Sequence, residues 1–396
     1  MIRWQKILTA WTAGAALLLG MPLLGVWLAG GDVAPYLEMP PRTNFVPHAA
    51  FSWPVFWGLA AFIVVMVRPF VWRIFSSSPS RITLPNPRRL GETPRPTNIK
   101  RISPGRAKPP AEPRLIRPFP WWGWAALGFG LVAWILAWTR FPWFAPFQPF
   151  TFTPLWLAFI ITMNALTFQR TGRSPLTHHT GAFLALFPLS ASFWWFFEYL
   201  NRFVQNWHYI GIGNLTAEEY VIRAMLPFAT VLPAFVVTRA WLASFPGLTA
   251  GLDNWRPCVV QHPHRLAWLG LTFATGGLAG ISLWPEYLFP LLWISPLIVI
   301  GSIRALNGTP TLLNAPGHGN WKPLFLAAIA ALVCGLFWEM WNVFSLEKWI
   351  YTVPFVDRFH LFEMPLLGYA GYLPFGIECA LIAEWVGIRE EETRKQ

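Results

Sequence analysis

Long apolar runs separated by short polar segments dominate this chain. Several runs reach the roughly 20 apolar residues that a helix needs to cross the hydrocarbon core of a bilayer. Their spacing predicts an all-α fold, a polytopic membrane bundle of about ten transmembrane helices. The expected spans cover residues 7–29, 51–74, 120–139, 153–169, 182–204, 221–244, 266–284, 287–304, 323–345 and 362–387.

Polar segments divide the pattern into parts. Ten Arg or Lys residues and only two acidic ones fall between 81 and 117, together with eight Pro. Such a segment cannot bury enough apolar surface to fold by itself, which predicts an extended linker. The expected organisation is two N-terminal transmembrane helices in 1–80, a basic Pro-rich cytoplasmic linker in 81–119, a membrane repeat in 120–245, a cytoplasmic connector in 246–263, a second membrane repeat in 264–388 and a charged tail in 389–396.

A phrase of polar and aromatic residues occurs twice within the apolar runs. Glu198, Asn201, Phe203 and Pro233 recur 141 positions later as Glu339, Asn342, Phe344 and Pro374, and the pair Trp207 and Tyr209 recurs 142 positions later as Trp349 and Tyr351. The recurrence predicts two tandem repeats of four helices. An even number of spans in each unit indicates parallel repeats, whose interface is the usual place for a ligand cavity.

Composition and charge agree with a membrane protein. Hydrophobic residues make up 55% of the chain and charged residues 12%, with 26 Trp and 33 Phe. The net charge of +12 lies mostly in the linker and at the ends of spans. This is the distribution that sets topology, so it predicts both termini in the cytoplasm of a bacterial inner membrane and no nucleic-acid partner.

The sequence carries no signal for a metal or a cofactor. Its three cysteines have no zinc or disulfide spacing, and no CxxC, phosphate-binding loop, dinucleotide fingerprint or HExxH occurs. We therefore expect neither a metal site nor a cofactor.

The two repeated glutamates are the first candidates for chemistry. Glu198 and Glu339 each precede an Asn by three residues, so carboxyl and amide share a helix face among aromatic neighbours. A carboxyl enclosed by aromatic rings could remain protonated and serve as a general acid. The alternative for Glu198 is an intrahelical ion pair with Arg202, whereas position 343 gives Glu339 no such partner.

Acidic residues near the C-terminus form a second set. Glu363 and Glu378 enter a span that Gly368, Gly371 and Pro374 interrupt, and such interruptions point to binding sites in membrane proteins. We expect Glu363 to be a third catalytic residue beside the two repeated glutamates. The expected substrate-binding residues are Asn201, Trp207, Tyr209, Asn342, Trp349, Tyr351 and Glu378. For the two asparagines, hydrogen bonding between helices is the alternative role.

The stretch from Trp207 and Tyr209 through Glu218 and Glu219 to Pro227-Phe228 resembles the lycopene cyclase domain of the small, membrane-embedded type. The resemblance implies a helical membrane enzyme built from duplicated units, in which acidic residues protonate a polyene and cyclise it.

These observations predict a protein that binds an isoprenoid-like lipid, such as a carotenoid or a quinone, in an aromatic intramembrane cavity. Buried Glu residues would carry out acid/base cyclisation or isomerisation. Two other functions fit the sequence. The protein could be a proton-coupled transporter whose glutamates carry protons, or a non-catalytic subunit whose aromatic surface packs against a membrane-protein partner.

Overall fold

The computed structural model describes residues 2–41, 44–77 and 117–388, with side chains from residue 12 onward. The predicted linker therefore lies outside the described residues except at 117–119, and the predicted charged tail also lies outside them.

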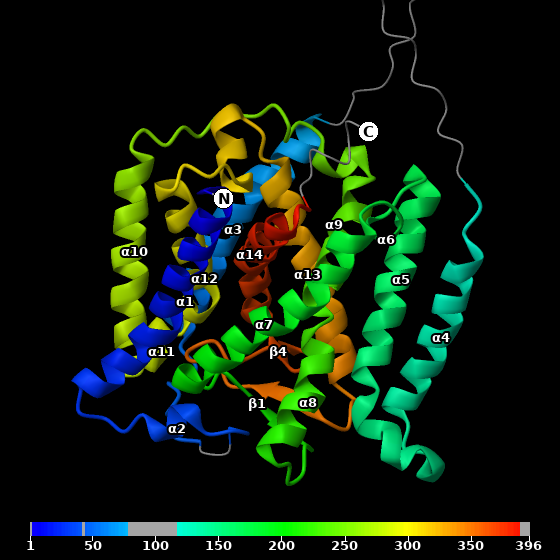
Figure 1. Cartoon of the computed structure of the whole chain (residues 1–396), viewed down its shortest axis with the longest axis horizontal. Helices are drawn as coiled ribbons and strands as arrows, with labels where there is room; N and C mark the ends of the chain where they lie inside the picture. Colours follow the sequence, from blue (N-terminus) through cyan, green and yellow to red (C-terminus); the bar gives the residue numbers. More distant parts are fainter. Residues whose placement is uncertain (1, 42–43, 78–116, 389–396) are drawn as a thin grey trace, which may run out of the picture.

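The described chain is mostly helical (Figure 1). Its α-helices are α1 (Ile2–Leu28), α2 (Ala34–Leu37), α3 (Trp53–Ser77), α4 (Trp121–Trp138), α5 (Phe152–Thr171), α6 (Pro175–His178), α7 (Thr180–Val204), α8 (Ala217–Phe228), α9 (Val231–Ala243), α10 (Pro263–Gly280), α11 (Pro285–Leu288), α12 (Pro290–Leu306), α13 (Lys322–Asn342) and α14 (Tyr372–Ala383). Its 3-10 helices are η2 (Pro142–Phe150), η3 (Pro246–Thr249), η4 (Leu312–His318), η5 (Leu366–Gly371) and η6 (Glu384–Val386). Its strands are β1 (Trp207–Ile210), β2 (Lys348–Tyr351), β3 (His360–Leu361) and β4 (Met364–Pro365).

The predicted helical fold is confirmed, and its apolar helices support a membrane-embedded protein, but the count of ten spans and the two tandem four-helix repeats are not confirmed. Among the described residues, seven helical segments are long and apolar enough to cross a bilayer. Two shorter apolar helices, Thr12–Leu28 and Pro290–Leu306, accompany them. The seven segments are Trp53–Ser77, Trp121–Trp138, Phe152–Thr171, Thr180–Val204, Ala217–Ala243, Lys322–Asn342 and Leu366–Val386.

Two of the expected spans are not single helices. The span predicted at 221–244 consists of α8 and α9, which meet at Thr230 just after the helix-interrupting Pro227. The span predicted at 362–387 begins as the 3-10 turn η5 and continues as α14. Gly368 and Gly371, which disfavour regular helix, account for this change.

The long helices stand side by side, with α10 at one edge of the bundle and α4 at the other (Figure 1). All four strands lie at one end of the bundle, which we call the strand end. The centre is occupied by α14, whose Phe375 and Leu381 are completely buried. By contrast, α3 and α4 expose large apolar side chains such as Phe62, Val65 and Leu131. Apolar outward faces are what helices in contact with lipid require.

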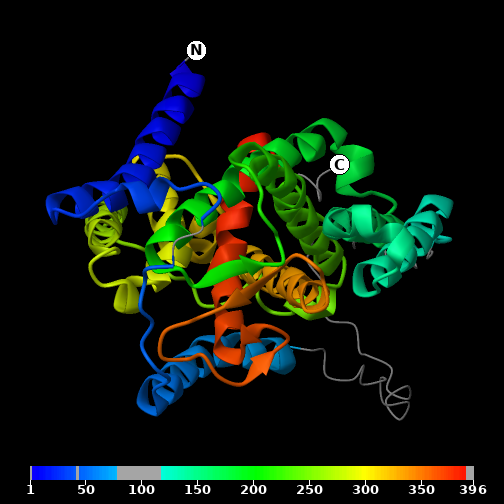
Figure 2. The ribbon, with the colours of Figure 1, turned by 90° about the horizontal axis from the view of Figure 1, so that it is seen from below.

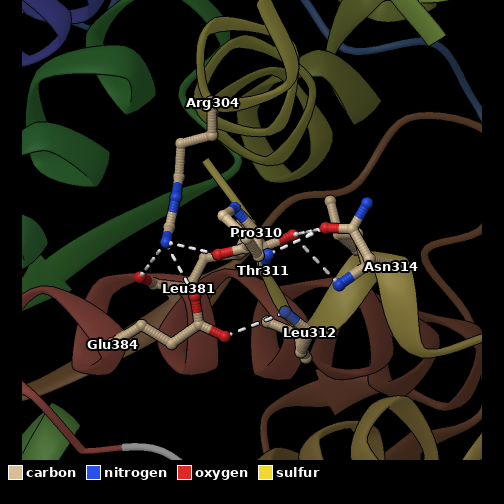
Figure 3. A network of polar contacts seen from close by, with 8 residues as sticks. Arg304, Pro310, Thr311, Leu312, Asn314, Leu381 and Glu384 are labelled. Carbon is tan, nitrogen blue, oxygen red and sulfur yellow. Dashed lines mark hydrogen bonds and ion pairs between the residues drawn. The ribbon is translucent and has the colours of Figure 1, made fainter. Parts of the chain in front are cut away.

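A buried ion pair joins α12 to the chain that follows α14 (Figure 3). Arg304 Nη1 lies 2.8 Å from Glu384 Oε2, with both side chains less than 10% exposed. The same guanidinium donates to the carbonyl oxygens of Leu381 and Pro310. Glu384 Oε1 accepts from the backbone N–H of Leu312 at 2.9 Å. The network therefore holds α12, η4 and the end of α14 together.

One close helix crossing leads to a stability prediction. A Cβ added at Gly25 of α1 would lie 1.7 Å from the carbonyl oxygen of Ala279 in α10, whereas a Cβ at Gly20 would meet nothing within 4 Å. Gly25→Ala should therefore destabilise the protein by about 1–3 kcal/mol, as overpacking does. Gly20→Ala should be neutral or slightly stabilising, because Ala is the better helix former. Thermal unfolding in detergent measures both variants, and equal midpoints would contradict the close crossing.

Candidate functional site: an aromatic cavity between the two repeated phrases

The two copies of the repeated phrase meet in space (Figure 2). β1 from the first copy pairs with β2 from the second in antiparallel orientation, with Trp207 opposite Tyr351 and Tyr209 opposite Trp349. Each copy therefore places its Trp beside the Tyr of the other copy. The aromatic pairs that sequence reasoning selected are brought together, 142 positions apart in the chain.

The repeated asparagines connect each helix to its strand. Asn201 Nδ2 donates to the carbonyl of Trp207 at 2.7 Å, and its Oδ1 accepts from the backbone N–H groups of Asn206 and Trp207. Asn342 repeats the arrangement, with Nδ2 donating to the carbonyl of Trp349 at 2.7 Å and Oδ1 accepting its N–H at 2.9 Å. Both side chains are thus occupied in positioning the Trp-x-Tyr strands.

Glu198 is buried behind the Trp207 and Tyr209 side chains of the first copy. Its Oε1 accepts from the Tyr209 hydroxyl at 2.6 Å, from Trp194 Nε1 at 3.1 Å and from Trp207 Nε1 at 3.2 Å. The nearby guanidinium of Arg202 donates instead to the backbone carbonyls of Tyr36 and Glu38. Aromatic donors, and not the cation of the alternative intrahelical ion pair, make the hydrogen bonds of this carboxyl.

Glu339 has a similar buried position in the second copy, beside Tyr351. Its Oε1 accepts from the Tyr372 hydroxyl at 2.7 Å and from the Tyr351 hydroxyl at 2.8 Å. Trp349 Nε1 donates to the Tyr351 hydroxyl at 2.9 Å, so Trp349 is connected to Glu339 through Tyr351. The second copy therefore also holds a buried carboxyl with tyrosine hydroxyls.

A cavity of about 150 Å³ lies in front of both carboxyls. Its walls are mostly aromatic. They are formed by Phe150, Phe152, Trp194, Trp207, Tyr209, Tyr220, Phe228, Trp293, Trp338, Trp349, Tyr351 and Tyr372, together with Arg223, Glu347 and smaller side chains. All four predicted aromatic binding residues line this cavity. The carboxyls of Glu198 and Glu339 stand one layer behind, reached through the tyrosines and tryptophans that face the space.

The strand tyrosines are hydrogen-bond donors at neutral pH. Burial, and next the negative charge of Glu198, raise the pKa of Tyr209 well above its ordinary value of 10.0. Burial and then Glu339 act in the same way on the pKa of Tyr351. Both hydroxyls therefore keep their protons and present them to the carboxyls.

One edge of the cavity is charged. Arg223 Nη1 on α8 lies 2.9 Å from Glu347 Oε1, and the guanidinium lies over the ring of Phe150 at 5.3 Å from its centroid. Burial raises the pKa of Glu347, and Arg223 opposes this effect. Phe150 and Leu226, which also line the cavity, are 43% and 51% exposed, so the cavity reaches the outer surface here.

The other two predicted acidic residues lie elsewhere. Glu363 forms an ion pair with Lys348 and does not line the cavity in the described structure. Glu378 is fully buried between α14 and α12, where its Oε1 accepts from the backbone N–H of Leu297 at 2.8 Å. Leu297 follows Pro296, which disturbs the helical hydrogen bonds around it. Glu378 thus accepts the hydrogen bond of a backbone N–H in α12 next to Pro296.

Sequence reasoning did not select Trp293 and Tyr372, although both line the cavity. Tyr372 donates to Glu339 from 33 positions away, and Trp293 contacts the ring of Trp207 with centroids 5.6 Å apart. Neither has a fixed spacing to the repeated phrase. Trp194, four residues before Glu198, is one of the aromatic neighbours of that carboxyl in the sequence.

The described residues contain no group of three His, Cys, Asp or Glu side chains that could hold a metal ion. Comparison of the chain with protein-family models, with curated proteins and with solved structures found no match.

Proposed function

We propose that this protein binds an isoprenoid-like lipid, such as a carotenoid or a quinone, in the aromatic cavity and moves protons to and from it. One observation carries the proposal. Two buried carboxyls, from corresponding positions of the repeated phrase, accept hydrogen bonds from tyrosines that line the same cavity. Aromatic faces bind apolar rings and polyenes, and the carboxyl–tyrosine pairs add the means of proton transfer.

The size of the cavity suits one end of such a lipid. A space of about 150 Å³ is of the size that holds a single six-membered ring. The remaining chain would leave past Phe150 and Leu226, where the cavity reaches the exposed surface. We therefore propose that the end of the lipid that carries or forms the ring enters, and that the rest of the molecule lies along the outside of α8.

The proposed chemistry is an acid/base cyclisation or isomerisation. In the reacting form Glu339 is protonated and donates to the oxygen of a tyrosine. The hydroxyl of that tyrosine turns to the substrate, gives its proton to a carbon–carbon double bond and takes the proton of Glu339. The resulting carbocation lies among Trp and Tyr faces, which stabilise positive charge. A second double bond of the same molecule closes the ring, and the adjacent carbon then loses a proton through Tyr209 to Glu198. The product is an isomer of the substrate. Glu198 then holds the proton that the substrate lost, so the cycle closes when Glu198 releases a proton and Glu339 regains one.

We further propose that the two copies belong to two tandem four-helix repeats within a bundle of about ten spans. The antiparallel pairing of β1 with β2 supports this arrangement. The distribution of cations supports a bacterial inner membrane with both termini in the cytoplasm. The strand end would then face outward. The resemblance of the Trp207–Phe228 stretch to membrane lycopene cyclase domains agrees with the proposed chemistry.

A cavity-filling variant tests lipid binding. Ala224 of α8 lines the cavity and is half-buried, whereas the neighbouring Met225 is exposed and does not line it. We expect Ala224→Phe to displace the ring and to lower lipid occupancy several-fold, while Met225→Phe leaves occupancy unchanged. Mass spectrometry of lipids extracted from the gently solubilised proteins measures both. Equal occupancy in the two variants would contradict binding in this cavity. A stoichiometric protein partner without any lipid would favour the role of a complex subunit.

A further inference from the structure

A second, smaller space adjoins the aromatic cavity. Its volume is about 40 Å³. The two spaces share a wall formed by Trp207, Trp293, Tyr351 and Tyr372. The two tyrosines of this wall are the donors to Glu339. Whatever occupies the smaller cavity therefore contacts two tyrosines that also line the aromatic cavity.

The smaller cavity is lined by a residue with an unpaired, buried polar atom in the described structure. Asn206 lines it and is 2% exposed, and its Oδ1 has no hydrogen-bond partner among the described residues. Leaving a buried acceptor unpaired costs about 1–3 kcal/mol. Buried water is the usual partner of such atoms, and each molecule needs about 10–15 Å³ of this kind of space. A cavity of 40 Å³ has room for two or three.

The hydroxyls of the shared wall can complete the hydrogen bonding of such water. The O–H of Tyr372 is donated to Glu339, but its oxygen retains acceptor capacity. A water molecule can thus donate to Asn206 Oδ1 and to the Tyr372 oxygen. On the outer side the cavity is bounded by Gly368 and Gly371 of the half-buried turn η5, which carry no side chains to close it.

We propose that the smaller cavity is a water site that resupplies protons to Glu339. A proton carried in by its water passes to the oxygen of Tyr372 as the hydroxyl proton of Tyr372 moves to Glu339. One proton thereby reaches the carboxyl from bulk solvent, and the tyrosine is restored. The presence of water in the smaller cavity does not depend on the proposed function, whereas the use of its proton in turnover does.

Gly371→Leu tests this proposal. Gly371 lines only the smaller cavity, a Cβ there would meet nothing within 4 Å, and its φ of −61° and ψ of −28° suit any residue. The leucine side chain should exclude the water without contacting the lipid. Gly128→Leu on α4, where the added Cβ also meets nothing within 4 Å, is the control. Gly371→Ala, a smaller change, provides a second variant should the leucine prevent folding.

Radiolytic footprinting of the full chain reports the water directly, because water bound beside a side chain promotes its oxidation. Met364 lines the smaller cavity at 5% exposure, and Met163 of α5 is 6% exposed but lines neither cavity. We expect Met364 to oxidise several-fold faster than Met163, and Gly371→Leu, or Gly371→Ala to a smaller extent, to slow it. Equal rates for the two methionines, or no change in either Gly371 variant, would overturn the water site.

Product formation tests the delivery of protons. With lipid occupancy equal to that of the unmodified protein, Gly371→Leu should lower turnover several-fold and Gly128→Leu should not. A protected Met364 with unchanged turnover would overturn the delivery role while leaving the water site. Absence of any bound lipid in the unmodified protein would instead contradict the proposed function, and the footprinting result would stand by itself.

Discussion

Glu339→Gln is expected to lower conversion of the bound lipid by about 10²- to 10⁴-fold, the usual contribution of a general acid. The amide has the shape of the carboxyl, and its Oε1 can still accept from Tyr351 and Tyr372, which donate at 2.8 and 2.7 Å. It has no acidic proton to pass on. Fold and lipid occupancy should therefore remain while the chemistry stops.

The same substitution at another buried carboxyl provides the control. Glu378 is also fully buried, but it lies between α12 and α14 and does not line the cavity in the described structure. Glu378→Gln keeps the acceptor for Leu297 and should leave conversion unchanged. Chromatography of isoprenoid products from cells that express each variant makes the comparison. Full conversion by Glu339→Gln would rule out its role as proton donor.

Arg304→Met should destabilise the protein by about 3–5 kcal/mol, because it leaves the buried carboxylate of Glu384 without its ion pair. Both side chains are almost fully enclosed, and the guanidinium also holds the carbonyls of Leu381 and Pro310 (Figure 3). Exposed ion pairs have much smaller effects, since water replaces the lost partner. The large expected loss therefore depends on burial.

A double variant separates the ion pair from simple packing. Arg304→Met combined with Glu384→Met removes both charges and keeps apolar volume in the interface, so much of the lost stability should return. Unfolding of the three proteins in the same detergent measures this. If adding Glu384→Met to Arg304→Met lowered the stability further and restored none of it, the two charges would not be coupled.

The sequence predicted the long helices well where apolar runs end at polar or Pro residues. The span expected at 120–139 is α4, Trp121–Trp138, and the one expected at 182–204 is α7, Thr180–Val204. Of the two breaks within apolar runs, the sequence indicated the one at Gly368 and Gly371 but not the one near Thr230. The interruption near Thr230 and the 3-10 turn η5 leave hydropathy unchanged, because they depend on backbone hydrogen bonds and not on side-chain polarity.

The candidate site was predictable where the chain repeats itself. The recurrence of Trp207 and Tyr209 as Trp349 and Tyr351 identified four residues of the cavity wall. The partner of each carboxyl could not be predicted, because tertiary packing decides it. Glu363 meets Lys348, Glu378 meets a backbone N–H and Glu339 meets Tyr372 through contacts that no local spacing records.

The most direct test of lipid binding is a high-resolution density map of the protein in discs of its native membrane lipid. We predict density for a ring between Trp207 and Trp349, within contact of the Tyr351 and Tyr372 side chains, continuing as a chain past Phe150 and Leu226. A map that resolves surrounding lipids but shows this cavity filled only by water or closed by its own side chains would contradict the account.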